Sequence, residues 1–140
     1  LGNFISGRFS VRIGVNRMVL WGTLFNAGGI GLNLVLFYAG LGTPLTFFGL
    51  MTLMGLGNGM LIPNATAGAL SVRPHLAGTA SGLSGAMMIG GGAALSALAG
   101  ALLGPGTGAF PLLWIMLCTA VGAILAIGVV IWRERSITMA

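Results

Sequence analysis

The stretch FPLLWIMLCTAVGAILAIGVVIW, from Phe110 to Trp132, decides the fold class because it contains no charged residue. A helix needs roughly 20 such residues to cross a hydrocarbon core about 30 Å thick. Apolar and polar residues do not alternate along it, as they do in the strands of a membrane barrel. Three similar uncharged segments precede it, at residues 18–39, 46–70 and 77–103. The sequence therefore predicts an all-α polytopic membrane protein, a bundle of four transmembrane helices.

The connections between these segments are short, so neighbouring helices are expected to run antiparallel. We divide the chain into residues 1–17, which form the end of a preceding helix and a basic loop, and residues 18–140, which form the bundle and a short tail. The chain opens with Leu1 and lacks the basic and then apolar regions of a signal peptide. We expect it to be the carboxy-terminal part of a longer membrane protein.

The composition agrees with a membrane protein. Hydrophobic residues make up 56% of the chain and charged residues 5%, with a mean hydropathy of +1.05. About a quarter of the residues in an average soluble domain are charged. The charges are six arginines and Glu134, and long uncharged stretches separate the arginines. Nucleic-acid binding is not expected, because it needs basic side chains clustered on a solvated face.

Most enzyme chemistry is excluded by the same inventory. Glu134 is the only acidic residue, so no carboxylate pair exists, and the absence of lysine removes P-loop and Schiff-base chemistry. His75 and Cys118 are each alone in their type. We therefore expect no catalytic residue, no metal site, no cofactor and no internal disulfide.

The arginines predict the orientation. They precede the first segment, lie between the second and third, or follow the fourth: Arg8, Arg12, Arg17, Arg73, Arg133 and Arg135. All six then fall on one side of a four-span topology. Because basic residues are retained on the cytoplasmic side, we expect both ends in the cytoplasm and the helices in the lipid bilayer of a bacterial inner membrane.

Two parts of the sequence carry a family resemblance. Residues 2–17, GNFISGRFSVRIGVNR, look like the basic, glycine-containing cytoplasmic loop of major facilitator superfamily transporters. Residues 57–60, 63–64 and 74–83, with Gly85, Gly91 and Ala93, are similar to helices ten and eleven of the Bcr/CflA drug-resistance transporters. The resemblance implies a partial major facilitator fold, in which the four segments are helices nine to twelve. It also implies proton-coupled multidrug efflux, with the missing amino-terminal half, a small-molecule substrate and protons as partners.

A different class of function fits the same helices. A small structural or assembly membrane protein would also present four apolar spans, without transport activity of its own. It would insert stably by itself, whereas a transporter fragment would need its other half. Sequence composition does not separate the two.

The basic loop is the first candidate site. Arg8 and Arg12 are four residues apart and share a face on a helical turn, where they could hold a carboxylate or the carbonyl end of a facing helix. Gly14 can supply a tight turn before Arg17. The alternative is that these arginines only anchor the segment at anionic headgroups.

Small residues mark the third segment as a packing helix. Gly78, Gly82 and Gly90 recur at four-residue intervals, with Ala86 and Ala94 completing the row. Small side chains let helices approach closely in lipid. The resemblance places such a helix at the junction of two transporter halves, whereas static packing inside one bundle is the alternative.

The second segment holds the candidate substrate cavity, at Asn58, Pro63 and Asn64. An unpaired amide in hydrocarbon costs several kcal/mol, so both asparagines should face protein or water. Pro63 removes a backbone donor and weakens the helix locally. The alternative is a pair of structural asparagines beside a kink. In the first segment, Asn26 and Asn33 are seven residues apart on one face, and we expect them to form interhelical hydrogen bonds.

Overall fold

The chain folds into four long helices and one short 3₁₀ helix. The structure is a computed structural model that describes residues 4, 8 and 13–138. The elements are α2 (Val15–Tyr38), α3 (Pro44–Ser71), η1 (Pro74–Leu76), α4 (Ala77–Leu102) and α5 (Phe110–Thr138). Each long helix has the length and apolar composition needed to cross a membrane, and the described residues form no strand. The predicted all-α membrane class is confirmed.

The turn between α2 and α3 is fixed by local sequence. Gly40 adopts a φ of 75°, a backbone conformation that glycine reaches without steric cost. The Thr46 amide donates to Thr43 Oγ1 at 3.2 Å, and the Thr43 amide donates to Thr46 Oγ1 at 2.9 Å. This reciprocal capping box starts α3, and Pro44 follows at a position where no intrahelical donor is needed. The two helices therefore fold back on each other.

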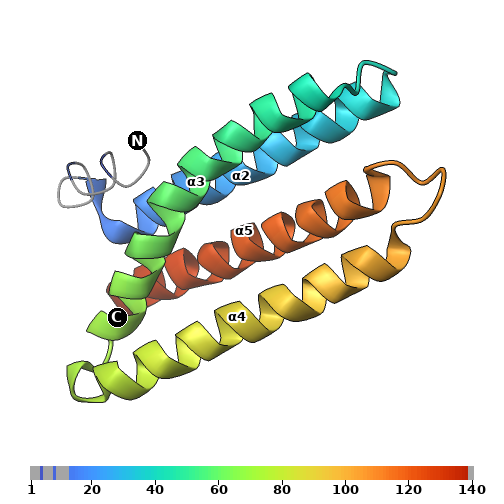
Figure 1. Ribbon diagram of the computed structural model, residues 1–140. Coiled ribbons are helices and arrows are strands. Elements are labelled where there is room, and N and C mark those ends of the chain that lie inside the picture. The colour runs from blue at the N-terminus through green and yellow to red at the C-terminus, as the bar shows by residue number, and fades with distance from the viewer. Residues whose placement is uncertain (1–3, 5–7, 9–12, 139–140) are drawn as a thin grey trace.

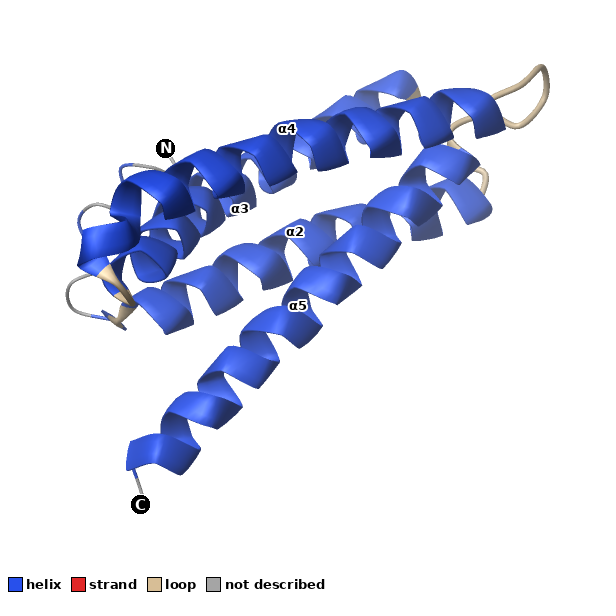
Figure 2. Ribbon diagram, turned by 90° about the horizontal axis from the view of Figure 1, so that it is seen from below, coloured by secondary structure: helices blue, strands red, loops and turns tan. Residues whose placement is uncertain are grey.

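Helix α2 is the centre of the packing. It contacts α3 extensively and also contacts α5, whereas the described part of α4 contacts only α3, η1 and α5. Figure 1 shows α2 and α3 paired side by side. Figure 2 shows α4 and α5 separating from each other with distance from the turn that joins them. The bundle is therefore a tight helix pair with a third helix against α2 and a fourth helix at its edge.

One face of α2 supplies most of the core. Its buried residues recur every three or four positions: Met18, Val19, Gly22, Thr23, Gly29, Ile30, Asn33 and Leu34. Residues at this spacing share one side of a helix. Met60 of α3 and Leu113, Ala120 and Ile127 of α5 are buried as well. The core thus lies where α2 meets its two neighbours.

The closest backbone contact joins Gly22 of α2 and Gly57 of α3. A Cβ added at Gly22 would lie 2.8 Å from the Gly57 carbonyl oxygen, and a Cβ added at Gly57 would lie 2.7 Å from the Gly22 carbonyl oxygen. Neither distance leaves room for a side chain. Gly29 makes a looser contact, since a Cβ added there would lie 3.4 Å from the Leu50 carbonyl oxygen. Glycine at these positions lets the two backbones pass closely.

Helix α4 is different, because its glycines face open space. A Cβ at Gly78, Gly82 or Gly90 would meet no described atom within 4 Å. Ala99 is the one buried residue of α4. Among the described residues, these glycines make no close contact with another helix. Static packing against helices outside the described residues stays the alternative. Their predicted role at an interface with a further part of a transporter stays a prediction.

The start of α2 and the end of α5 lie at the same end of the bundle. Figure 1 shows them at the end that carries the connection from α3 through η1 to α4. Arg17, Arg73, Arg133 and Arg135 belong to these segments, and these four arginines and Arg8 are exposed. The opposite end carries the turns at residues 39–43 and 103–109, which contain no charged residue. The basic charge is thus concentrated at one end.

Candidate functional site

Asn58 lies at the contact between α2 and α3. The Asn26 side-chain amide donates a hydrogen bond to Asn58 Oδ1 at 3.0 Å, and both side chains are partly buried. The bond lies close to the Gly22–Gly57 contact, one turn further along α2 from Gly22. Asn58 therefore has the hydrogen-bond partner that is expected of a structural asparagine, the alternative to a substrate-cavity residue.

Asn33 makes a second bond from α2 to α3. It is fully buried, and its Nδ2 donates to the Phe47 carbonyl oxygen at 3.3 Å. Together with the Asn26–Asn58 bond, it confirms the expected interhelical hydrogen bonds of Asn26 and Asn33. Amides on one face of α2 thus fix the register of α3.

Pro63 and Asn64 lie further along α3 and face different environments. Asn64 is 4% exposed, and its Nδ2 donates to the Met60 carbonyl oxygen at 2.7 Å, one turn earlier in the same helix. Pro63 is exposed and has no amide hydrogen for the Gly59 carbonyl oxygen. Figure 1 shows α3 bending in its second half. A proline kink explains that bend.

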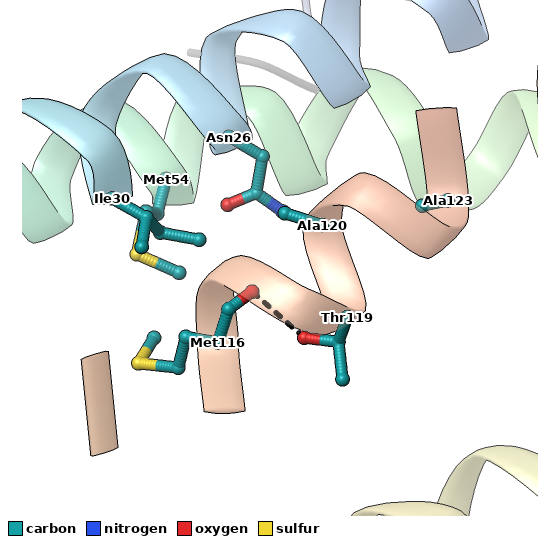
Figure 3. Close-up of a pocket in the computed structure, with 7 residues that line it drawn as sticks. All are labelled: Asn26, Ile30, Met54, Met116, Thr119, Ala120 and Ala123. Carbon is teal, nitrogen blue, oxygen red and sulfur yellow. Dashed lines mark hydrogen bonds between the residues drawn. The ribbon is translucent and has the colours of Figure 1, made fainter. Parts of the chain in front are cut away.

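A cavity of about 230 Å³ lies between α2, α3 and α5 (Figure 3). Its lining consists of Asn26, Ile30, Met54, Met116, Thr119, Ala120 and Ala123. None of Asn58, Pro63 and Asn64 lines this cavity. Their role as a substrate site stays a prediction, although Asn58 is linked to the cavity through Asn26.

The polar side chains that line this cavity are those of Asn26 and Thr119. Asn26 Oδ1 is buried and has no hydrogen-bond partner among the described residues. Thr119 Oγ1 donates its proton to the Met116 carbonyl oxygen at 2.8 Å. Figure 3 shows the Asn26 side chain extending from α2 toward Ala120 and Thr119 of α5, with both methionine side chains to one side. The lining is therefore apolar apart from the Asn26 amide and the exposed Thr119 hydroxyl.

The basic loop is described in part. Arg8 and Arg17 are exposed, and Gly14 adopts a φ of 93° immediately before α2. The expected place of Arg17 in the loop is wrong, because Arg17 lies in the first turn of α2. Arg12 lies outside the described residues, so the expected shared face of Arg8 and Arg12 is not described. Next to Arg17, Asn16 Nδ2 donates to Glu134 Oε2 at 2.7 Å. This bond joins the start of α2 to the end of α5.

Two features of the site were not predicted from the sequence. The Gly22–Gly57 contact was missed because neither glycine belongs to a long row of small residues. The cavity was missed because it needs three helices, and Met116 and Thr119 look like ordinary lipid-facing residues in the sequence. The spacing of Gly22, Asn26, Gly29 and Asn33 was the available signal, since it puts small and amide residues on one face.

Comparison with known proteins adds no assignment. The chain gives no match to a protein-family model, to a curated protein or to a solved structure.

Proposed function

We propose that the chain is the carboxy-terminal part of a secondary active transporter, which exports apolar or cationic drugs in exchange for protons. The observation that supports this is the unpartnered small-residue face of α4. Its glycines recur at regular intervals, yet a Cβ added at Gly78, Gly82 or Gly90 would meet no described atom within 4 Å. A helix of this kind fits an interface with a second group of transmembrane helices, where small residues allow close approach and rocking.

The proposal includes an orientation and a location. Both ends and the segment around Arg73 face the cytoplasm, and the membrane is a bacterial inner membrane. The support is the concentration of exposed arginines at the end of the bundle where α2 begins and α5 ends. Reporter fusions after Arg73 and after Arg135 should report the cytoplasm, and a fusion at Gly106 the opposite side. A cytoplasmic Gly106 would contradict the orientation.

Proton coupling in this proposal depends on residues outside the chain. Glu134 is the only acidic residue, and it lies at the basic end beside Asn16, not in the middle of a span. Proton relays in transporters use ionisable groups within the membrane. The proton-carrying carboxylate is therefore assigned to the amino-terminal half, and the loop of Arg8, Arg12 and Gly14 is assigned to contacts between the halves.

Proton-coupled transport can be measured in inverted membrane vesicles that contain the complete gene product. After the vesicle interior is acidified, addition of ethidium or tetraphenylphosphonium should partly collapse the pH gradient, because each exported cation is exchanged for protons. Vesicles without the protein serve as the control. An unchanged gradient with both probes, while the protein is present and inserted, would favour the small structural or assembly protein.

A further inference from the structure

We propose that the outer face of α2 binds an anionic phospholipid, with its phosphate at Arg17 and one acyl chain in a groove over Gly28. The groove is an open hollow of about 320 Å³ on the surface of α2 and α3. Its lining includes Trp21, Leu24, Phe25, Gly28 and Leu32 of α2 and Leu53 of α3. It shares no lining residue with the cavity of Figure 3, and the inference does not depend on the transport function.

Gly28 creates the groove because large apolar residues surround it on the same face of α2. Leu24 and Leu32 lie one turn before and one turn after Gly28. A Cβ added at Gly28 would meet no described atom within 4 Å, and Leu24, Phe25 and Leu32 are exposed. Lipid tails are as apolar as these side chains, so such a surface is stable against lipid. The groove therefore opens to the acyl chains of the bilayer.

The length of the groove suits one acyl chain. Trp21 and Leu32 lie about 16 Å apart along the helix axis, at a rise of 1.5 Å per residue. One leaflet contributes about 15 Å of a hydrocarbon core that is roughly 30 Å thick. Trp21 lies at the end of the groove nearer the basic end of the bundle, and indole rings settle at the membrane–water interface. An acyl chain can therefore follow the groove from the interface into the core.

Arg17 places a positive charge in line with the groove. Arg17, Trp21, Leu24, Gly28 and Leu32 follow one another at intervals of three or four residues, so they form one row along α2. Arg17 is exposed at the start of this row. The order of cation, indole and apolar groove matches the order of phosphate, ester groups and acyl chain in a phospholipid.

The charges favour an anionic headgroup over a zwitterionic one. Glu134 is the only acidic residue of the chain, and it accepts a hydrogen bond from Asn16, which does not belong to the row. The row therefore offers a cation for a phosphate but no carboxylate for the amine of a zwitterionic headgroup. A headgroup with a net negative charge fits this arrangement best.

The same row argues against a transmembrane helix as the occupant. The close helix contact of this chain joins two facing glycines, Gly22 and Gly57. Gly28 instead has a leucine one turn away on each side, and these bulky side chains keep a second backbone at a distance. A flexible acyl chain is thinner than a helix and fits between them. A helix would also have to bring an acidic group to Arg17, whereas the lipid brings its phosphate.

The test measures quenching of Trp21 fluorescence in vesicles that contain the full chain. Trp114→Phe and Trp132→Phe leave Trp21 as the only tryptophan. The quencher is phosphatidylglycerol with a 6,7-dibromostearoyl chain, titrated into phosphatidylcholine, and the matched quencher is phosphatidylcholine with the same chain, titrated into phosphatidylglycerol. Trp21 should prefer phosphatidylglycerol roughly fivefold, as expected for one arginine beside an anionic headgroup.

A chain that keeps only Trp114, near the uncharged end of α5, is the control and should show no such preference. Equal preferences at Trp21 and Trp114 would overturn the proposal. Weak quenching of Trp21 by both lipids would overturn it as well, because it would show that another helix covers this face.

Two pairs of variants locate the lipid. Arg17→Gln should abolish the preference of Trp21 for phosphatidylglycerol, whereas Arg135→Gln, at an exposed arginine on α5, should leave it unchanged. Gly28→Leu fills the groove and should weaken the preference severalfold. Gly31→Leu is its control, because Gly31 also faces open space but does not line the groove. A full preference after Arg17→Gln or after Gly28→Leu would place the lipid elsewhere and refute the assignment.

Discussion

Helices α3 and α4 are both long, apolar and rich in glycine, yet they pack very differently. Gly57 of α3 sits so close to α2 that an added Cβ would lie 2.7 Å from the Gly22 carbonyl oxygen. Gly82 and Gly90 of α4 meet no described atom within 4 Å. Both helices have the small residues that permit close approach, so small residues alone do not explain the difference.

The difference lies in the amide side chains that accompany the glycines. Asn58 on α3 bonds to Asn26 on α2, and Asn33 on α2 bonds to the backbone of α3. Helix α4 contains no asparagine or glutamine. In lipid the hydrophobic effect does not drive helices together, so close van der Waals contact and interhelical hydrogen bonds decide which helices pair. Glycine rows therefore make a helix able to pack, and polar partners select its neighbour.

The largest effect is expected from Gly57→Ala. The new Cβ would collide with the α2 backbone, which cannot move as a flexible side chain can, and we expect a loss of about 1–3 kcal/mol in the free energy of unfolding. Denaturation of the purified chain in mixed micelles measures this loss. Gly55→Ala on the same helix is the matched control, because a Cβ there meets nothing within 4 Å.

The same contact can be tested from α2. Gly22→Ala should also destabilise the chain, and the double variant should lose less than the sum of the single losses because the two glycines share one contact. If Gly57→Ala were as stable as Gly55→Ala, the close α2–α3 contact would be wrong.

A smaller effect is expected from Asn58→Ala, which removes the partner of Asn26. We expect a loss of about 0.6–2 kcal/mol and a lower abundance in the membrane. A double-mutant cycle with Asn26→Ala should give a coupling energy near 0.6 kcal/mol. In the complete protein, a changed ratio of effluxed substrates at normal abundance would instead show that Asn58 lines a substrate cavity.

The smallest effect on the chain itself is expected from Gly82→Leu and Gly90→Leu. The faces are open, and leucine is favourable in the bilayer, so the stability should change by no more than about 0.5 kcal/mol. In the proposed transporter the same changes should impair export, because they would separate α4 from the proposed amino-terminal half. Unchanged export with both glycines replaced would show that these faces meet lipid.

The sequence by itself determined the number and kind of the helices. Four long uncharged segments identify four spans, because the transfer of a helix into lipid depends on the composition and length of that segment alone. The start of α3 differs from the prediction, because the segment was expected from residue 46, whereas Thr43 caps a helix that begins at Pro44. The sequence predicted that Asn26 and Asn33 form interhelical hydrogen bonds, since an amide in an apolar span needs a partner. It did not predict which groups accept those bonds.

Only the tertiary structure decided which of the small residues form contacts. Every glycine lacks a side chain, so its effect on packing depends on whether a second backbone lies close to it. The backbone of α3 lies close to Gly22, whereas no described helix lies close to Gly82. The cavity follows the same rule, since Asn26, Met54 and Thr119 come from three helices and become neighbours only when α3 and α5 pack against α2. Composition determines whether each segment forms a membrane-spanning helix. Contacts and hydrogen bonds between helices depend instead on how the helices are placed relative to one another, and only their packing sets that placement.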